Sequence, residues 1–289
     1  MKVKILLMMF AITTAFLLTS CDSALNPLTG KNAPTLFPIR QNDKWGYINK
    51  KGEVVIQPQF EGHLGTSIGF FSESLAVACI ESQKLGYIDK TGKFTINPQF
   101  DAGGMLGSFS EGLAVVRVGD KHGFIDKAGI IVINPQFDGA GSFNEGLATV
   151  GVGGKTGFID KEGKLVVNPQ FDVAFPFING LAAVQIGKQF GYIDKTGKIV
   201  INPQFDLALP FSEEGLAMIS VGEKVGFVNK EGKYTINPQF GLESYSAGMT
   251  SVMLFEDISG YGRASFSEGL APFKLVIVLA ILIKQEKFL

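Results

Sequence analysis

The feature that most constrains this chain is a motif that occurs six times, once every 34 to 40 residues. The glycine of a glycine–aromatic pair recurs at Gly46, Gly86, Gly123, Gly157, Gly191 and Gly226. The phenylalanine that closes a Pro-Gln-Phe triplet recurs at Phe60, Phe100, Phe137, Phe171, Phe205 and Phe240. Both series are spaced by 40, 37, 34, 34 and 35 residues. A period of this length is typical of repeat arrays, in which each unit buries its apolar face against its neighbours.

Residues 147–171 show what one unit is expected to form. Alternating apolar residues begin a first strand, and a Gly-Gly-Lys turn leads into a second strand. Asp160 and Gly163 then hold the first and fourth positions of a tight turn, where Asp accepts a backbone N–H and Gly takes left-handed dihedrals. A third strand over residues 164–167 is expected to end at the Asn-Pro pair containing Pro169, because proline cannot donate to a ladder. Each unit is therefore predicted to be a three-stranded antiparallel meander.

These residues resemble the bacterial WG repeat family, whose units combine an aromatic-Gly pair with Glu-Gly-Leu-Ala, Gly-Tyr/Phe-Ile-Asp-Lys-x-Gly and Pro-x-Phe segments. Lys44-Trp45-Gly46 carries the signature literally. Later units keep the frame but replace the tryptophan with Leu85, His122, Thr156, Phe190 and Val225. The resemblance covers residues 37–273 and implies a β-repeat protein without implying any reaction. We expect an all-β fold in which tandem meanders form an open β-solenoid-like array, with a closed β-propeller as the alternative.

The N-terminus has the features of an export signal. Two lysines precede a 14-residue apolar stretch that ends at Leu18, which is the length of a signal-peptide core and too short to span a membrane comfortably. Leu18-Thr19-Ser20-Cys21 resembles the bacterial lipobox, in which the cysteine is lipidated and becomes the new N-terminus. We therefore predict a signal peptide over residues 1–20, a lipid on Cys21 and a flexible tether over residues 21–36. An ordinary signal peptide that contains a cysteine is the alternative. The lipid would anchor the protein in the bacterial cell envelope, outside the cytoplasm.

The length of the units varies almost entirely in one connection. The distance from the leucine of Gly-Leu-Ala to the phenylalanine of Pro-Gln-Phe is 24 or 25 residues in every complete copy. The distance from that phenylalanine to the next such leucine is 15, 13, 10, 10, 11 and 30 residues. Connections of this kind are expected to be surface loops on one side of the array, and such loops are where binding sites usually lie.

The longest connection, residues 241–269, is the candidate binding loop. It carries side chains of the types that are enriched at interfaces, Tyr245, Met249, Met253, Phe255, Tyr261 and Arg263. An extra hairpin that caps the end of the array is the competing interpretation, and we favour it slightly over a ligand site.

The charged residues of the motif have a structural explanation. Stacking of the units would align one lysine from each copy along an edge, namely Lys50, Lys90, Lys127, Lys161, Lys195 and Lys230. Such a row could meet a phosphate-bearing polymer, but an aspartate precedes four of these lysines and cancels much of their field. Turn chemistry explains both residues without a ligand. The aspartates are solitary, so they do not form the clustered pattern of a calcium loop.

Composition and residue patterns argue against several classes of function. The formal net charge is −1 and only 18% of residues are charged, which does not favour a nucleic-acid partner. The two histidines, His63 and His122, belong to different units and to no recognisable catalytic motif. Cys79 is the one cysteine left after Cys21, and we interpret it as a small apolar strand residue. We predict no catalytic residue, no metal ligand and no cofactor.

The leading function is a non-catalytic envelope lipoprotein that presents its loops to a protein or glycan partner. The alternative is an envelope polysaccharide-processing enzyme whose site is assembled across repeat loops. Converging carboxylates in one cleft would favour the enzyme, whereas a continuous aromatic groove would favour binding.

The C-terminal segment, residues 274–289, departs from the motif. The sixth copy of the Leu-Ala phrase, at Leu270, leads into nine apolar residues between Lys274 and Lys284, too few to cross a membrane. Codons that encode residues 280–288 can also spell Gly-Tyr-Ile-Asp-Lys-Thr-Gly-Lys-Ile in another frame, which is identical to residues 191–199. We therefore expect residues 37–273 to hold six units and the start of a seventh, followed by a frameshifted remainder. A capping or docking strand is the alternative.

Overall fold

The computed structural model describes residues 36–61, 69–79, 84–102 and 107–241. These residues form 21 β-strands in antiparallel sheets, and the described part of the chain contains no helix. We divide it into six units, one for each copy of the motif, over residues 36–61, 69–101, 107–137, 139–171, 173–205 and 207–241. The predicted all-β class and the predicted antiparallel repeat are confirmed.

The first three units have three strands each. Unit 1 contains β1 (Leu36–Gln41), β2 (Lys44–Asn49) and β3 (Val54–Glu61). Unit 2 contains β4 (Ala76–Cys79), β5 (Lys84–Ile88) and β6 (Phe94–Asp101), and a pair between Glu61 and Cys79 joins it to unit 1 in one sheet. Unit 3 contains β7 (Ala114–Val118), β8 (Lys121–Ile125) and β9 (Ile131–Phe137).

The last three units have four strands each. Unit 4 contains β10 (Gly139–Ala140), β11 (Ala148–Val152), β12 (Lys155–Ile159) and β13 (Leu165–Phe171). Unit 5 contains β14 (Val173–Ala174), β15 (Leu181–Ile186), β16 (Gln189–Asp194) and β17 (Ile199–Phe205). Unit 6 contains β18 (Leu207–Ala208), β19 (Leu216–Val221), β20 (Lys224–Asn229) and β21 (Tyr234–Gly241). The additional short strand was not predicted, and it corrects the three-stranded meander expected for these units.

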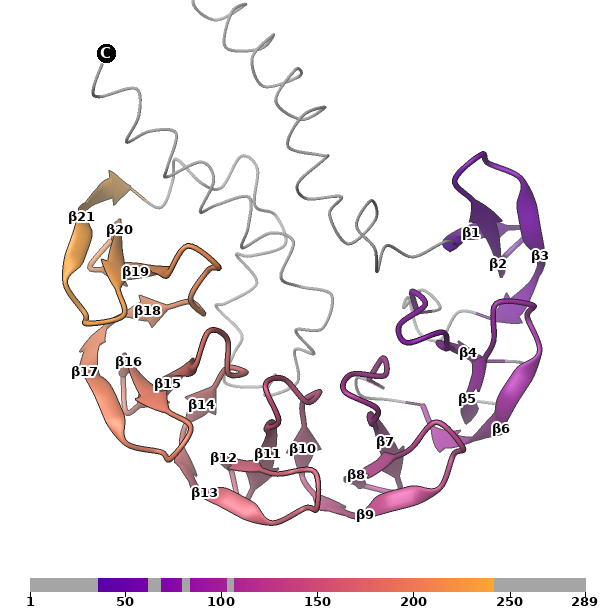
Figure 1. Ribbon diagram of the computed structural model, residues 1–289, viewed down its shortest axis with the longest axis horizontal. Coiled ribbons are helices and arrows are strands. Elements are labelled where there is room, and N and C mark those ends of the chain that lie inside the picture. The colour runs from indigo at the N-terminus through magenta and orange to yellow at the C-terminus, as the bar shows by residue number, and fades with distance from the viewer. Residues whose placement is uncertain (1–35, 62–68, 80–83, 103–106, 242–289) are drawn as a thin grey trace, which may run out of the picture.

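The units follow one another around an arc, with the third strand of each motif on the outer side (Figure 1). The described strands do not close this arc into a ring, so the predicted open array is confirmed within them. The arc is curved like part of a propeller. It differs in that respect from a straight rod of stacked meanders.

The turn between the second and third strands has the predicted geometry. In unit 4, the N–H of Gly163 donates to the carbonyl of Asp160 at 3.0 Å, and the N–H of Lys164 donates to the Asp160 carboxylate at 2.8 Å. Gly163 has φ of +82°, which a residue without a Cβ adopts at little cost. The same turn recurs in the other units, with Asn49 and Asn229 in place of aspartate in units 1 and 6.

The third strand continues through its proline, which corrects the predicted strand end. In unit 4, Thr156 pairs with Phe171 and Phe158 pairs with Val167, so two steps along β12 correspond to four along β13. The residues in between form a bulge, in which the proline needs no ladder hydrogen bond.

The bulge explains the glycine of the repeated motif. It presses backbone atoms against Gly157, where an added Cβ would lie 2.5 Å from the carbonyl oxygen of Val167 and 2.6 Å from the nitrogen of Pro169. The five equivalent glycines face the same approach, at 2.4–2.6 Å from the carbonyl oxygen. A side chain at this position would therefore push the third strand away from the second.

The hydrophobic core lies between neighbouring units. One cluster combines Phe158 and Phe171 of unit 4 with Phe177 and Ile193 of unit 5, and all four side chains are at most 2% exposed. The rings of Phe158 and Phe177 lie 4.7 Å apart in a tilted arrangement that other junctions repeat. Each unit thus buries its apolar face against the next one, as expected for a repeat array.

Candidate binding surfaces and the contacts between units

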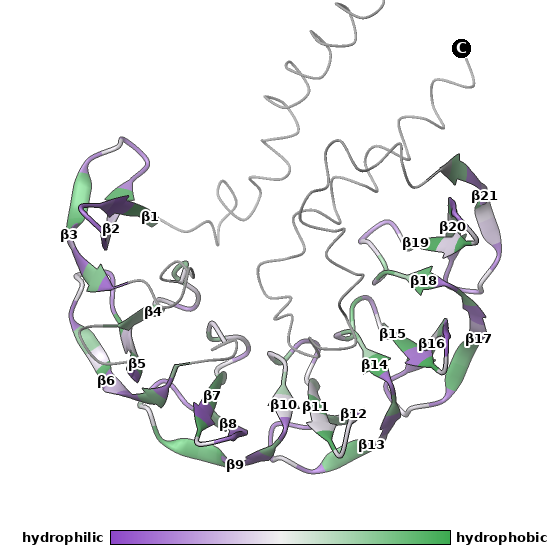
Figure 2. Ribbon diagram, turned by 180° about the vertical axis from the view of Figure 1, so that it is seen from behind, coloured by the Kyte–Doolittle hydropathy of each residue, from purple (hydrophilic) through white to green (hydrophobic). Residues whose placement is uncertain are grey.

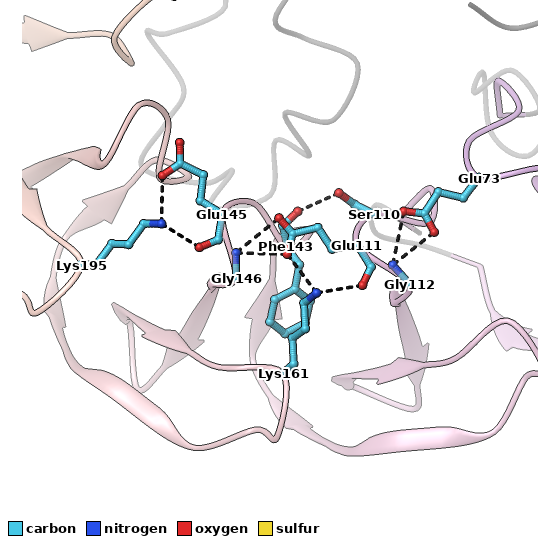
Figure 3. Close-up of polar contacts among 9 residues, drawn as sticks. All are labelled: Glu73, Ser110, Glu111, Gly112, Phe143, Glu145, Gly146, Lys161 and Lys195. Atoms are coloured by element: carbon cyan, nitrogen blue, oxygen red, sulfur yellow. Dashed lines mark hydrogen bonds and ion pairs between the residues drawn. The ribbon is translucent and has the colours of Figure 1, made fainter. Parts of the chain in front are cut away.

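Units 2, 3 and 4 each hold the following unit through a glutamate of their inner turn, which is the turn directly before Leu75, Leu113 or Leu147. Glu111 of unit 3 accepts hydrogen bonds from the backbone N–H of Gly146 in unit 4, at 3.0 and 3.3 Å to its two oxygens. It also forms an ion pair of 3.2 Å with Lys161 of unit 4, whose ammonium donates to the Glu111 carbonyl as well (Figure 3). Ser110 adds a hydrogen bond of 2.7 Å to the carbonyl of Phe143. One side chain therefore holds two separate elements of the following unit.

The same arrangement recurs along the inner turns. Glu73 accepts from Gly112 and pairs with Lys127 at 2.9 Å, and Glu145 accepts from Gly180 and pairs with Lys195 at 3.1 Å. Figure 3 shows the contacts of Glu73 with Gly112 and of Glu145 with Lys195. At the next junction the acidic residue is replaced by Asn179, whose side-chain amide donates to the carbonyl of Ser212 and whose own carbonyl accepts from Lys230. The contacts that Glu73, Glu111, Glu145 and Asn179 make with the following unit form an inter-unit ladder.

The ladder carboxylates come from strained backbone. Glu73, Glu111 and Glu145 have φ between +49° and +54°, and Asn179 has +55°. A non-glycine residue in this region is energetically unfavourable unless its surroundings fix it. Each of these residues lies between the two ends of a narrow loop, such as Ser110 and Leu113, whose backbones pair with each other. This loop geometry directs the carboxylate towards the following unit.

The electrostatics of Glu73 reflect both burial and pairing. Burial raises the pKa of Glu73, but hydrogen bonds from Lys127 and from the Gly112 backbone outweigh it and hold the pKa below its usual value. The Glu73 carboxylate is therefore ionised at neutral pH and bound to Gly112 and Lys127 of the neighbouring unit.

A second carboxylate contact lies at the end of the third strand in units 2 to 5. Asp138 pairs with Lys121 of its own sheet at 2.5 Å and accepts from the N–H of Gly153 in the next unit at 2.8 Å. Asp172 repeats this with Lys155 and Gly187. The lysine and then the backbone hydrogen bond lower the pKa of both aspartates. Asp101 and Asp206 make the same backbone contact with the following unit.

Buried tyrosines bind backbone carbonyls in three units. The hydroxyl of Tyr192 donates to the carbonyl of Leu209 at 2.8 Å, and the hydroxyl of Tyr87 donates to Gly107 at 2.9 Å. Tyr47 makes the equivalent bond to Gly69. Burial raises the pKa of Tyr87 and of Tyr192, so both phenols stay neutral in the physiological range.

The lysine row has partners that the sequence analysis did not identify. Lys127, Lys161 and Lys195 pair with glutamates of the preceding unit, whereas the aspartate beside each of them accepts hydrogen bonds within its own turn. The predicted turn role is therefore confirmed for the aspartates, whereas the charge that compensates these lysines comes from the neighbouring unit.

The shorter connections are part of the scaffold, which corrects the expectation that they are free surface loops. In units 4, 5 and 6 they contain β10, β14 and β18, each of which pairs with the strand that follows it. They also contribute Phe143, Phe177 and Phe211, which are at most 1% exposed. A phenylalanine at a nearly constant distance before each Gly-Leu-Ala was the signal that could have revealed this.

Exposed aliphatic side chains lie on the outer strands. Figure 2 shows hydrophobic segments in β3, β9, β13 and β17, which run along the outside of the arc. The exposed members at the start of these strands are Val54, Val55, Ile131, Val132, Leu165, Val166, Ile199 and Val200, each between 41% and 46% exposed. Their neighbours such as Val167 point inward and are buried.

The candidate residues of the sequence analysis divide into two groups. Cys21 and the candidate binding loop, Tyr245, Met249, Met253, Phe255, Tyr261 and Arg263, lie outside the described residues, as do His63 and residues 274–289. Cys79 is 4% exposed in β4, as expected for an apolar strand residue, and burial raises the pKa of its thiol. His122 is buried in β8, opposite Arg117 and Phe137.

The described part of the chain lacks both a cluster of metal-ligand side chains and a long apolar helix. No group of three or more His, Cys, Asp or Glu side chains in it is arranged to hold a metal ion. No helix within the same residues is long and apolar enough to cross a bilayer.

The solved structures that are similar to the chain include three at 10–16% sequence identity. It is 10% identical to BamB from Moraxella catarrhalis, with a TM-score of 0.49 over 73% of this chain and 75% of that one. It is 12% identical to the computationally designed Ika8 protein, with a TM-score of 0.46 over 70% of each chain. It is 16% identical to a protein of unknown function from Bacteroides caccae, with a TM-score of 0.34 over 71% of this chain and 92% of that one. No curated protein matches the chain.

The comparison with protein families identifies the repeat itself. The model described as WG containing repeat matches residues 45–82, 86–121, 123–155, 157–189 and 190–224. Each match begins within one residue of a motif glycine, so the matched units follow the same period as the structural ones. Together the matches cover more than half of the sequence, and the protein therefore belongs to the WG containing repeat family.

Proposed function

We propose that this protein is a non-catalytic binding scaffold of the bacterial cell envelope, anchored by lipid on Cys21. Its repeat array would present the longer connections, and above all residues 241–269, to a protein or glycan partner. The scaffold role has support from the family and from the fold, because repeat arrays commonly use variable connections for recognition. No cofactor and no nucleic acid belong to this proposal.

The inter-unit ladder is the observation that carries the proposal. The glutamates of the inner turns hold the following unit, as Glu111 holds Gly146 and Lys161. Catalytic carboxylates usually form a singular pair whose environments differ, whereas these recur in equivalent surroundings. Recognition is therefore assigned to the parts of the chain that differ between units.

Membrane anchoring can be tested with the two cysteines of the chain. The wild-type protein is expected to incorporate labelled palmitate in the bacterial host and to sediment with membranes. Cys21→Ser should lose the label and the sedimentation. Cys79→Ser is the matched control and should keep both. Equal labelling of the Cys21→Ser variant would contradict the proposed anchor.

The binding role can be tested by photo-cross-linking in intact cells. A photoreactive phenylalanine analogue replaces Tyr245 or Tyr261 in the candidate binding loop, and replaces the exposed Glu162 of a repeat turn as the control. The loop positions are expected to give a discrete adduct with one protein or glycan, and the turn position none. Adducts that are equal at all three positions, or absent from both loop positions, would contradict recognition through this loop.

A further inference from the structure

Unit 6 ends in an apolar face that is more exposed than the equivalent face of unit 5. In unit 5, Ile201 and Phe205 are 3% and 0% exposed, because Ala217 and Ile219 of unit 6 pack against them in one cluster. Ile236 and Phe240 hold the same positions in unit 6, but both are only half-buried. We call Ile236 and Phe240 the end face.

The chain itself contains a segment that matches this face. Residues 265–271 read Ser-Phe-Ser-Glu-Gly-Leu-Ala, which repeats the Ser-Phe-Asn-Glu-Gly-Leu-Ala of residues 142–148 at six of seven positions. In unit 4 that segment provides Phe143 and Ala148, which are at most 1% exposed and lie in one cluster with Ile133 and Phe137 of unit 3. The segment therefore has the side chains that an opening strand of a further unit would need.

We propose that residues 265–273 dock on the end face as the opening strand of a seventh unit. Leu270 corresponds to Leu216, so Ala271 and Phe273 correspond to Ala217 and Ile219, the two residues that cover the preceding unit at the last described junction. The proposal thus extends a contact that the structure already contains at that junction. Residues 265–269 belong to both this segment and the candidate binding loop, whereas all six candidate binding side chains lie before the docking segment.

Polar groups at the end of unit 6 fit the same occupant. Glu214 directly precedes Gly215, as Glu145 directly precedes Gly146, and the Glu145 carboxylate accepts from the N–H of Gly180 in the following unit. Glu214 is exposed in its turn. Docking of residues 265–273 would bring the N–H of Gly269 to the place that Gly180 occupies, where a carboxylate of unit 6 can accept its hydrogen bond.

The connecting segment is long enough for this arrangement. Residues 242–264 separate the last described strand from the docking segment. An extended chain advances about 3.3 Å per residue, so these residues can span several times the distance of about 10 Å between packed sheets. The other occupants that the end face could accept are a second copy of the chain or a different protein, and the test distinguishes them.

Photo-cross-linking within the full chain provides that test. A photoreactive phenylalanine analogue replaces Phe240, which it resembles in shape, and in a control it replaces Tyr234, which lies on the same strand but is 45% exposed. Isotopically labelled and unlabelled chains are mixed before irradiation, and the adducts are mapped by mass spectrometry. Position 240 is expected to link to residues 265–273 of the same chain, and position 234 is not. Adducts between two copies, adducts with another protein, or no adduct in that segment would overturn the proposal.

A stability comparison provides an independent readout. Ala76, Ala114, Ala148, Ala182 and Ala217 are at most 1% exposed at the position that corresponds to Ala271. Ala271→Asp would place a charge at the docked face and is expected to lower the unfolding temperature of the full chain. Ala264→Asp lies just before the docking segment and is expected to leave the unfolding temperature unchanged. Equal unfolding temperatures for the two variants would overturn the proposal.

Discussion

Replacement of Gly157 by alanine tests the structural reason for the motif glycine. The added Cβ would lie 2.5 Å from the carbonyl oxygen of Val167 and 2.6 Å from the nitrogen of Pro169, both of which are backbone atoms that cannot rotate away. The optimal separation of non-bonded heavy atoms is about 3.5–4.0 Å, so the backbone of the bulge would have to move away by about 1 Å. Overpacking of this kind, together with a loosened strand pair, is expected to cost about 2–4 kcal/mol.

Gly151→Ala is the matched control in the same sheet. A Cβ on Gly151 would lie 3.4 Å from its nearest neighbour, the nitrogen of Gly139, which is an ordinary contact. This variant is expected to change the free energy of unfolding by less than about 1 kcal/mol. Urea denaturation of the full chain in mild detergent, followed by circular dichroism, compares the two variants. If Gly157→Ala is as stable as Gly151→Ala, the explanation of the motif glycine is wrong.

Three further perturbations follow from the contacts between units, each measured as the unfolding temperature of the full chain. Glu111→Gln is expected to cost only about 0.5–1 kcal/mol, because its ion pair with Lys161 is partly exposed, and added salt should reduce the difference from wild type; a difference that salt leaves unchanged would contradict an ionic contribution. The folded-state pKa of Asp172 is lowered by Lys155, so its stabilisation is complete above the unfolded value of about 3.9 and is lost as the pH falls through the folded value. Asp172→Asn should therefore be less stable than wild type at pH 7 and converge with it under strong acid, whereas a gap that persists in acid would refute this. Tyr192→Phe removes a hydrogen bond of 2.8 Å and should cost about 1 kcal/mol; an unchanged stability would show that the bond contributes nothing.

The architecture could be predicted because the sequence contains six clear copies of one motif. The motif glycines, such as Gly157, and the phenylalanines of Pro-Gln-Phe, such as Phe171, recur at regular intervals and indicated stacked β-units. The Asp160–Gly163 pair indicated the turn that joins the second and third strands. Both are local signals, since turn dihedrals and strand alternation depend on neighbouring residues. The bulge was missed because proline in a strand usually ends it. Residue propensities for strand and turn cannot predict how closely Gly157 approaches the backbone of the third strand.

The contacts between units could not be predicted for a different reason. Glu111 and Lys161 are 50 residues apart, and only the stacking of complete units brings them together. For four of the six lysines, the nearest opposite charge along the chain is the adjacent aspartate, which local reasoning therefore favours as the partner. The short strands β10, β14 and β18 were missed because two residues are too few to show alternation.

The central claim is that the repeated carboxylates hold neighbouring units and are not available to a ligand. The most direct measurement is the hydrogen-exchange rate of the Gly146 amide in the full chain, compared between wild type and Glu111→Ala. The account predicts that Gly146 is protected in the wild type and loses protection in the variant, while Gly180, which donates to Glu145, stays protected in both. A Gly146 amide that exchanges in the wild type at the rate of an unstructured peptide would contradict the account.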